Sequence, residues 1–531
     1  MKGQLLIALF LAAVYQLTAA LQWPSTSSTD IYAIRSQRDL TLNVSMDQLI
    51  YPAINLNTVL LEPLNYTYDV LASFTDLVSW GASRFFLDLY WNDKKSRWQV
   101  CPFIDGVQHE QERDRNGNHT VFELNHGGTE EAAIFYYNDS VYLCNLTLLF
   151  EEFLLDIVKE QWILTTDDNL NAKTVIVTLN LRNAIEPDYA PNAAVISESF
   201  QISSAIENSA SMTSSAPLAY PSESFLKLSE KIEFVLDGYA YTPGLLAIDR
   251  QQSSTWNSTG MSSTGWPLLD NVLFRNFYRI LFSFGEVEVS DEEYDIEGDK
   301  TTIFSSAEIP YTGERAVKYS SAFSSAQLQS STSPVCSIRR DTYLVDITST
   351  DNVVSPSFLL ASDTSESRFS VDAVRQYIKC GFSPMLNATG KDEDDIIDYV
   401  TKNLAGSKWS WSDDQPADLL NISDVSSAPT RCARLAEKGW EVTNCYAKYR
   451  AACRISKGAY SFVLSRKEVT YYDSVSACSG SNEVFTVPRT ALQNSVLQKL
   501  RQDTVGSEAI WIDVNSLAEP VRFEEYPHCA Q

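Results

Sequence analysis

The stretch RFFLDLYW, at residues 84–91, decides the fold of this chain. Apart from Arg84 and Asp88 it is apolar and aromatic, which is typical of a strand buried within a sheet. The segment before it, from Ala72 to Gly81, has the apolar spacing of a helix and ends on a glycine, a common helix terminator. A helix followed by a buried strand is the repeating unit of an α/β sheet.

The same alternation continues to about residue 390. Thr174 to Leu181 is predicted to be a second buried strand. Three further helices are predicted over residues 222–238, over residues 267–285 and over residues 370–381, where Ser370 can cap the first turn. Residues 21–390 are therefore predicted to form an α/β domain with a parallel sheet, of the TIM-barrel kind.

Residues 407–531 have a different composition. Trp409, Trp411 and the cysteines from Cys432 to Cys453 crowd into a short segment with few long periodic helices. This pattern indicates a smaller, disulfide-rich α+β domain. The acidic residues at 392–395 and at 398 predict that residues 391–406 are an acidic linker between the two domains.

The first 20 residues predict a cleaved signal peptide. Lys2 precedes an apolar run over residues 5–14, and small residues at 18–20 suit a signal peptidase. The run is too short to span a bilayer comfortably, and a buried N-terminal helix is the alternative. No later stretch is apolar enough to cross a membrane, so the rest of the chain is expected to be extracytoplasmic.

Glycosylation acceptors and cysteines agree with a secretory compartment. Acceptor sequences Asn-x-Ser/Thr occur at Asn43, Asn65, Asn118, Asn138, Asn145, Asn257, Asn387 and Asn421. The nine cysteines should mostly be paired in an oxidising compartment. Because their number is odd, at least one is free or has its partner outside this sequence.

The formal net charge of −27 argues against nucleic acid as a partner, because a phosphate backbone would be repelled. No Cys/His grouping suggests zinc, and the acidic run at 291–299 lacks the register of an EF-hand. No metal and no cofactor are therefore predicted.

The first domain resembles the phosphatidylinositol-specific phospholipase C and glycerophosphodiesterase barrels, through residues 34–39 (IRSQRD) and the strand at 85–91 followed by 98–101 (WQVC). Active members have a histidine in the first motif, Glu-x-Asp in the strand and a second histidine further on. Here the first motif has no histidine, the strand keeps only Asp88, and Cys101-Pro102 stands in the second place. We therefore predict no catalytic residues, because acid–base chemistry on a phosphodiester needs such groups. The alternative is a phosphodiesterase of altered mechanism that uses Asp88 with Arg35, Arg38 or His126.

The second domain resembles a C-type lectin-like domain, through Trp409-Ser410-Trp411, Gln415-Pro416, Cys432, Trp440 and Cys445. Its second half precedes its first, which implies a permuted order, and two truncated copies are the alternative. The resemblance implies the pairs Cys432–Cys445 and Cys453–Cys478. Ala417 and Val442 stand where calcium ligands are expected, so a calcium lectin is the weaker hypothesis. Further predicted pairs are Cys101–Cys144 and Cys336–Cys380, which leave Cys529 over.

As a whole, the chain resembles the fungal maintenance of telomere capping protein 6 family, from about residue 30 to the end. Residues 265–267 (GWP), 380–384 (CGFSP), 430–433 (TRCA) and 487–490 (VPRT) are among those that carry the resemblance. It implies a single-pass type I membrane glycoprotein, although no such span occurs in the sequence; either the protein is secreted or an anchoring tail is missing. A role in telomere capping would be indirect, because an acidic secretory glycoprotein does not lie on chromosome ends.

These observations predict a non-catalytic glycosylated protein of the secretory pathway or cell surface. Its work would be recognition, with a cell-wall glycan, a lipid headgroup or another protein as the ligand. A phosphodiesterase of altered mechanism and a carbohydrate-binding lectin are the competing hypotheses.

Overall fold

The computed structural model describes most of the chain. The described residues are 21–104, 132–138, 140–166, 168–186, 227–252, 265–289, 296–311, 316–318, 339–340, 343–344, 358–416, 432–455, 460–480 and 482–515. Several predicted features lie outside them: the signal peptide at 1–20, the acceptors Asn118, Asn257 and Asn421, and Cys336, Cys529 and His126.

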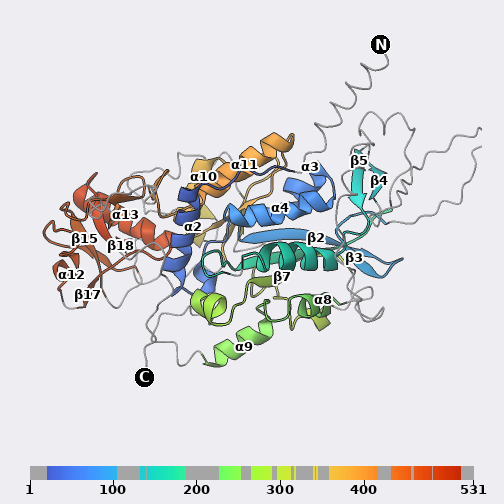
Figure 1. Cartoon of the computed structure of the whole chain (residues 1–531), viewed down its shortest axis with the longest axis horizontal. Helices are drawn as coiled ribbons and strands as arrows, with labels where there is room; N and C mark the ends of the chain where they lie inside the picture. Colours follow the sequence, from blue (N-terminus) through green and yellow to red (C-terminus); the bar gives the residue numbers. More distant parts are fainter. Residues whose placement is uncertain are drawn as a thin grey trace, which may run out of the picture.

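The larger unit is built on a curled sheet whose central strands are all parallel (Figure 1). In spatial order the strands are β7 (Ile280–Val287), β6 (Val175–Asn183), β2 (Arg84–Asn92), β1 (Ala53–Asn55), β12 (Ser383–Leu386), β11 (Leu360–Ser362) and β8 (Ala316–Lys318). A short strand, β3 (Arg97–Gln99), returns antiparallel to β2. The first and last thirds of the chain meet where β1 pairs with β12, as they do in a barrel, while β7 and β8 do not pair within the described residues. The α/β class and the predicted strands at 84–91 and 174–181 are confirmed.

The two faces of this sheet differ in chemistry. Phe85, Leu87 and Leu89 of β2 point outward into the main apolar core. That core is covered by α4 (Tyr68–Ser79), η3 (Phe153–Ile163), α8 (Leu228–Val235), α10 (Val371–Lys379) and α11 (Glu393–Gly406). Alternate residues face the concave side, because successive side chains of a strand point to opposite faces.

Three predicted helices are present in the structure. The helix α4 ends before Gly81, whose φ of +106° is a conformation that residues with a Cβ rarely adopt. The side chain of Ser370 caps α10 by accepting a hydrogen bond from the backbone N–H of Ala373 (3.2 Å). The helix predicted over 222–238 is present as α8, and residues 221–226 lie outside the described part.

The helix predicted over residues 267–285 is wrong. A short helical segment, η6 (Asn271–Arg275), is followed by the strand β7. Between them Phe277 adopts a positive φ of 60° and is 53% exposed. The apolar run that follows is buried on both faces of the sheet, and periodicity alone cannot distinguish such a run from a buried helix.

The acidic linker predicted over residues 391–406 is also wrong, since this segment is the helix α11. Asp392 caps it by accepting from the N–H of Asp395 (2.9 Å), and the acids of its first turn suit the positive end of the helix dipole. Ile396, Tyr399 and Val400 are buried in the main core. The acidic run is therefore a helix start and not a spacer.

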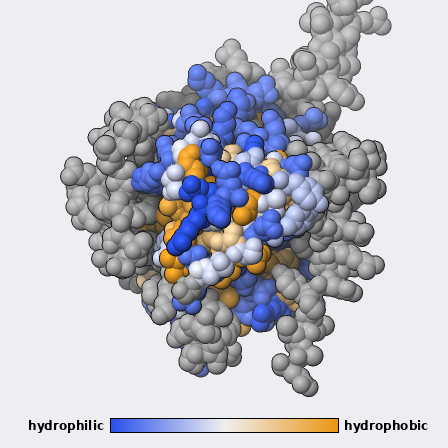
Figure 2. Space-filling view, turned by 90° about the vertical axis from the view of Figure 1, so that its left-hand side faces the viewer, coloured by the Kyte–Doolittle hydropathy of each residue, from blue (hydrophilic) through white to orange (hydrophobic). Residues whose placement is uncertain are grey.

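The C-terminal unit is a second, smaller sheet. Its strands are β14 (Trp440–Thr443), β13 (Cys432–Leu435), β18 (Ile510–Asn515), β15 (Arg450–Ile455), β16 (Phe462–Leu464) and β17 (Glu483–Phe485), with the helices α12 (Ser474–Ala477) and α13 (Ala491–Val505). The side of the molecule that carries this unit faces the viewer in Figure 2, where hydrophobic side chains lie among hydrophilic ones. The exposed apolar residues of the unit include Tyr446, Tyr472, Val475 and Val484.

The N-terminal helix α2 (Ser28–Thr41) lies between the two sheets (Figure 1). Its Ala33 is buried in the core of the C-terminal unit, together with Trp440 and Leu497. Gln37 accepts hydrogen bonds from the backbone N–H groups of Trp409 (2.7 Å) and Ser410 (3.1 Å). The C-terminal unit thus incorporates a segment from the start of the chain.

Candidate functional site

A row of polar side chains follows the concave face toward the carboxyl ends of the parallel strands. It consists of Asn387, directly after β12; Asn55, at the end of β1; Asp88, in β2; and Asn180 and Arg182, in β6. We call these five residues the polar row. Active sites of barrel enzymes lie at this end of the strands, so the polar row is the first candidate for a functional site.

Asp88 forms the centre of the polar row and is buried, with 7% of its surface exposed. Its carboxylate accepts from Arg182 Nε (2.8 Å) and from Asn180 Nδ2 (2.6 Å). Its backbone N–H donates to Asn57 Oδ1 (2.9 Å). Both carboxylate oxygens therefore have internal partners, and the charge is neutralised by the guanidinium.

Further acids surround Arg182. Its guanidinium contacts Glu286 (3.1 Å) and Glu288 as well as Asp88. Burial lowers the pKa of Arg182, but the carboxylates outweigh this effect and raise it above the usual value. Burial and the charge of Asp88 together raise the pKa of Glu62. Among the described residues in contact with Arg182, three carboxylates, those of Asp88, Glu286 and Glu288, outnumber its single guanidinium.

The other end of the polar row is an amide pair. Asn55 Nδ2 donates to Asn387 Oδ1 (2.7 Å), and the Thr58 hydroxyl donates to the same oxygen (3.1 Å). The fully buried carboxylate of Asp363 holds the loop after β12 by accepting from the N–H groups of Asn387 (2.5 Å) and Ala388 (3.1 Å). Burial raises the pKa of Asp363 to about 7.

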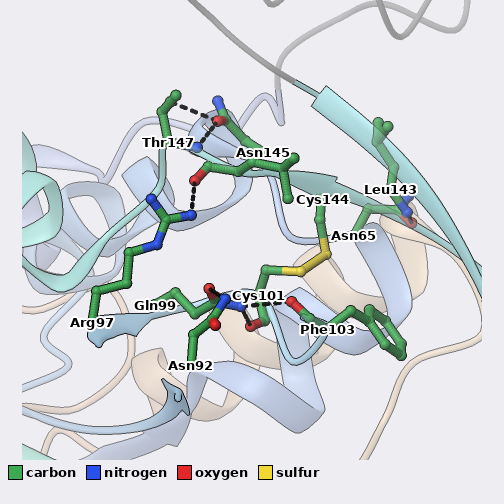
Figure 3. Close-up of a disulfide and its surroundings, with 11 residues drawn as sticks. Asn65, Asn92, Arg97, Gln99, Cys101, Phe103, Leu143, Cys144, Asn145 and Thr147 are labelled. Carbon is green, nitrogen blue, oxygen red and sulfur yellow. Dashed lines mark hydrogen bonds between the residues drawn. A yellow bond between two sulfur atoms is a disulfide. The ribbon is translucent and has the colours of Figure 1, made fainter. Parts of the chain in front are cut away.

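A disulfide-tied hairpin lies beyond the end of β2 (Figure 3). Cys101, just after β3, is bonded to Cys144 of the hairpin β4–β5 (Ala132–Tyr137 and Ser140–Asn145). Gln99 Nε2 donates to the carbonyls of Cys101 (2.8 Å) and Phe103 (2.7 Å) and so fixes the turn. Around Phe103 the rings of Phe135, Tyr137 and Tyr142 form an aromatic cluster, with centroids 5.0 to 5.8 Å away.

Three of the four predicted disulfides are present: Cys101–Cys144, Cys432–Cys445 and Cys453–Cys478. Cys380 is also disulfide-bonded. Because Cys336 lies outside the described residues, the pair Cys336–Cys380 stays a prediction, as does the free Cys529.

The described glycosylation acceptors differ in exposure. Asn43 and Asn138 are exposed, and Asn65 and Asn387 are half-buried. Asn145 is 7% exposed, and its Oδ1 accepts from both the N–H (2.9 Å) and the hydroxyl (2.7 Å) of Thr147 (Figure 3). The buried side chain of Asn145 therefore offers less room for an attached glycan than the exposed side chains of Asn43 and Asn138.

The similarity to known proteins follows the order of these elements along the chain. Residues 24–405 match a family model described as the MTC6 partial TIM-barrel domain, which covers the half-barrel and α11. The chain belongs to the maintenance of telomere capping protein 6 family. No solved structure gives a significant match.

Curated relatives extend the similarity beyond the half-barrel. Maintenance of telomere capping protein 6 of Komagataella phaffii is 24% identical, over 97% of this chain and 86% of its own length. The protein of that name from Yarrowia lipolytica is 24% identical over 94% of this chain and 81% of its own. The one from Saccharomyces cerevisiae is 25% identical over 93% and 78%. The resemblances to phospholipase C and to C-type lectins stay predictions.

Asp88 does not meet Arg35 or Arg38, the two arginines named with it for an altered phosphodiesterase. Arg38 donates to the carbonyl of Ala172, just before β6, whereas Asp88 lies beside Asn180 in that strand. At roughly 3.3 Å per residue these positions are about 25 Å apart, at opposite ends of the sheet. Arg35 contacts Asn171, at the same end as Arg38. His126 lies outside the described residues.

Polar side chains next to the positions where calcium ligands were expected have internal partners. Gln415 Oε1 accepts from the N–H of Val442 (3.1 Å). Glu441 forms an ion pair with Arg434 (2.8 Å). In the part of the chain that the structure describes, no group of three or more His, Cys, Asp or Glu side chains is placed to hold a metal ion. Within those same residues, no helix is long and apolar enough to cross a bilayer.

Sequence reasoning identified Asp88 but missed its partners Asn180 and Arg182. The signal was present, because residues 175–183 (VIVTLNLRN) place Thr178, Asn180 and Arg182 at alternate positions, with leucines between them. Such alternation puts all three on one face. The contribution of Asn55 and Asn387 could not be seen, since they are 332 residues apart in sequence.

Proposed function

We propose that this protein is a non-enzymatic recognition protein of the secretory pathway, and that its polar row binds a neutral polyhydroxylated ligand such as a cell-wall glycan. The amides of Asn55 and Asn387 can both donate and accept, which is what the hydroxyl groups of a sugar require, whereas the amide of Asn180 is engaged by Asp88 and by the N–H of Glu286 and orients the row. A few polar groups that converge at the carboxyl end of a barrel sheet are typical of ligand sites.

The neutralised state of Asp88 carries this proposal. A carboxylate that is buried and bonded to Arg182 and Asn180 is a poor general base and a poor metal ligand, because either role would break those contacts. Glu62, Glu286 and Glu288 add negative charge around it. A phosphodiester would be repelled there, whereas a neutral hydroxylated ligand would not.

The aromatic cluster around Phe103 supports the same class of ligand. Tyr137 and Tyr142 are half-buried and therefore partly accessible. Aromatic faces offer packing area for the C–H groups of a sugar ring, while their hydroxyls keep a polar contact. The cluster is tied to the end of β2 by the disulfide Cys101–Cys144.

A secretory location is supported by the disulfides, which persist in oxidising compartments and are rare in the cytosol and nucleus. The exposed acceptors Asn43 and Asn138 are consistent with such a location. A link to telomere capping, which the name of the relatives states, would then be indirect, through the cell wall or the secretory pathway.

Binding of neutral oligosaccharides by variants of the full chain tests the site. We expect β-glucan or mannan oligosaccharides to bind the wild-type protein in calorimetry, and Asn55→Ala to weaken binding about tenfold, the effect of losing one or two good hydrogen bonds. Asn276→Ala is the matched control, since Asn276 is exposed at the other end of the sheet, just before β7. Equal affinity of both variants would overturn the assignment of the site.

A further inference from the structure

A cleft lies at the amino end of the parallel strands, opposite to the polar row. It has a volume of about 590 Å³ and lies between α2, the residues that precede β1, β2 and β6, and the C-terminal unit. Tyr51, Ser83 and Thr174 line it from the larger unit, and Trp409 and Thr490 line it from the C-terminal unit. A volume of this size suits a small organic ligand, for which sites of about 300 to 1,000 Å³ are usual.

The charge of this cleft is opposite to that of the whole chain. Arg35, Arg38, Lys173 and Lys408 line it, and Asp76 is the single acid among the lining residues. Arg38 is paired with Asp39, and Lys408 with Asp30. The cleft of a protein with a net charge of −27 thus concentrates cationic side chains.

Two of these cations have no acidic partner among the described residues. Arg35 donates to Asn171 Oδ1 (3.2 Å) and lies 5.8 Å from the ring of Tyr32. Lys173 donates to the carbonyl of Val78 (2.6 Å), at the end of α4. Burial, reinforced by Arg38 and Arg35 on α2, lowers the pKa of Lys173 to about 7. An anion in the cleft would relieve the repulsion between Lys173 and the two arginines.

The walls of the cleft are largely aromatic and aliphatic. The indoles of Trp23, Trp80, Trp162 and Trp409 line it, beside Ile34 and Leu269. The Trp23 indole N–H and the Thr174 hydroxyl have no hydrogen-bond partner, which is costly for donors shielded from water. An acceptor oxygen in the cleft could satisfy such donors.

We propose that this cleft binds an amphipathic organic anion. Its phosphate, sulfate or carboxylate group would contact Lys173 and Arg35, and its apolar part would lie against Trp80 and Trp409. The cations supply the attraction for the charged group, and the indoles bury apolar surface. The site is separate from the polar row and does not depend on the function proposed for it.

Octyl sulfate is a suitable probe, because its charge is constant across the useful pH range. We expect it to bind the full chain in calorimetry, and octyl glucoside, which is uncharged, to bind at least tenfold more weakly. Lys173→Met and Arg35→Gln should each weaken the binding of octyl sulfate about tenfold. Lys402→Met, at an exposed position of α11, is the control and should change nothing. Equal binding of the two detergents, or full affinity in both cleft variants, would overturn the proposal.

The dependence of binding on pH gives a second readout. Arg35 and Arg38 from α2 act on the charge of Lys173. The other charged groups that line the cleft are Asp76 from α4 and Lys408. Because Lys173 loses its proton as the pH rises through about 7, octyl sulfate should bind more weakly at pH 8.5 than at pH 6. The Lys173→Met variant should lose this difference. A slope that persists in the variant would contradict the role given to Lys173.

Two natural sources of such a ligand can be separated with phosphates. Lysophosphatidate carries an acyl chain, whereas glycerol 3-phosphate has the same charged group alone. Tighter binding of lysophosphatidate by at least tenfold would support a lipid ligand. Equal binding of the two would overturn the apolar part of the proposal and leave a soluble phosphoester as the ligand.

Discussion

At the scale of the residue, the most informative groups are charges placed where burial changes their behaviour. Asp88 is held by Arg182, Asp363 is buried against backbone N–H groups, and Lys173 lies beside two arginines. These contacts join segments far apart in sequence, so a sequence pattern could identify a residue such as Asp88 but not its partners. For the same reason Lys173 could not be identified from the sequence. It belongs to no motif, and only its neighbours in the fold distinguish it.

Asp363 should make stability depend on pH. Its pKa is raised to about 7, so the folded protein holds the proton more tightly than the unfolded chain, whose Asp titrates near 4. The stability from this group is therefore present below pH 4 and lost as the pH rises through 7. Asp363→Asn should remove this slope, on the order of 2 to 4 kcal/mol, in chemical denaturation at pH 5 and pH 8. An unchanged slope would show that Asp363 ionises normally.

Glycan occupancy should follow exposure. Asn43 is exposed after α2, whereas Asn145 is buried and bonded to Thr147. We expect mass spectrometry of enzymatically deglycosylated peptides to find Asn43 modified and Asn145 unmodified in protein from a eukaryotic secretory host. Full occupancy at Asn145 would mean that the hairpin β4–β5 does not adopt this packing when the glycan is added.

At the scale of the element, prediction succeeded at α10, whose apolar residues lie on one face, and failed at β7, which is apolar on both faces, and at α11. The helix α10 has Val374 and Ile378 on one side and Ser370 as a cap, so its pattern was unambiguous. The strand β7 is apolar on both faces and was predicted to be helical. The acidic residues at the start of α11 were interpreted as a linker. A helix cap can be recognised only together with the buried residues that follow it.

The helix α2 should be needed for the C-terminal unit. Gln37 accepts from the N–H groups of Trp409 and Ser410 and from the Ser410 hydroxyl (2.9 Å). Gln37→Leu would leave these donors without a partner and should cost about 2 kcal/mol in the free energy of unfolding. Gln251→Leu, on an exposed helical position, is the matched control. If both variants unfold at the same denaturant concentration as the wild type, α2 does not hold the two units together.

The disulfide Cys101–Cys144 should stabilise the hairpin beside the polar row. It closes a loop with a sequence separation of 43, for which loop-closure entropy predicts a loss of about 2 to 4 kcal/mol when both cysteines become serine. Thermal unfolding of the double variant measures this loss. Hydrogen exchange should rise in residues 132–145 and not in the C-terminal unit. A uniform rise over both sheets would contradict a local role.

At the scale of the whole molecule, the described residues cluster acids at one end of the parallel sheet and bases at the other. The carboxyl end gathers Asp88, Glu62, Glu286 and Glu288 around one arginine, while the amino end gathers Arg35, Arg38 and Lys173. The α/β class and the family could be predicted from the sequence, since buried strands and collinear motifs carry both. The charges at the two ends of the sheet could not be predicted, because they depend on which residues the parallel register brings side by side.

The most direct test of the central claim is thermal unfolding and turnover of the full chain with two ligands in parallel, a neutral β-glucan oligosaccharide and an inositol phosphodiester. The recognition role predicts a rise in melting temperature with the oligosaccharide, no rise with the phosphodiester, and no hydrolysis of either. Hydrolysis of the phosphodiester that Asp88→Ala abolishes would contradict the claim and restore the enzyme hypothesis.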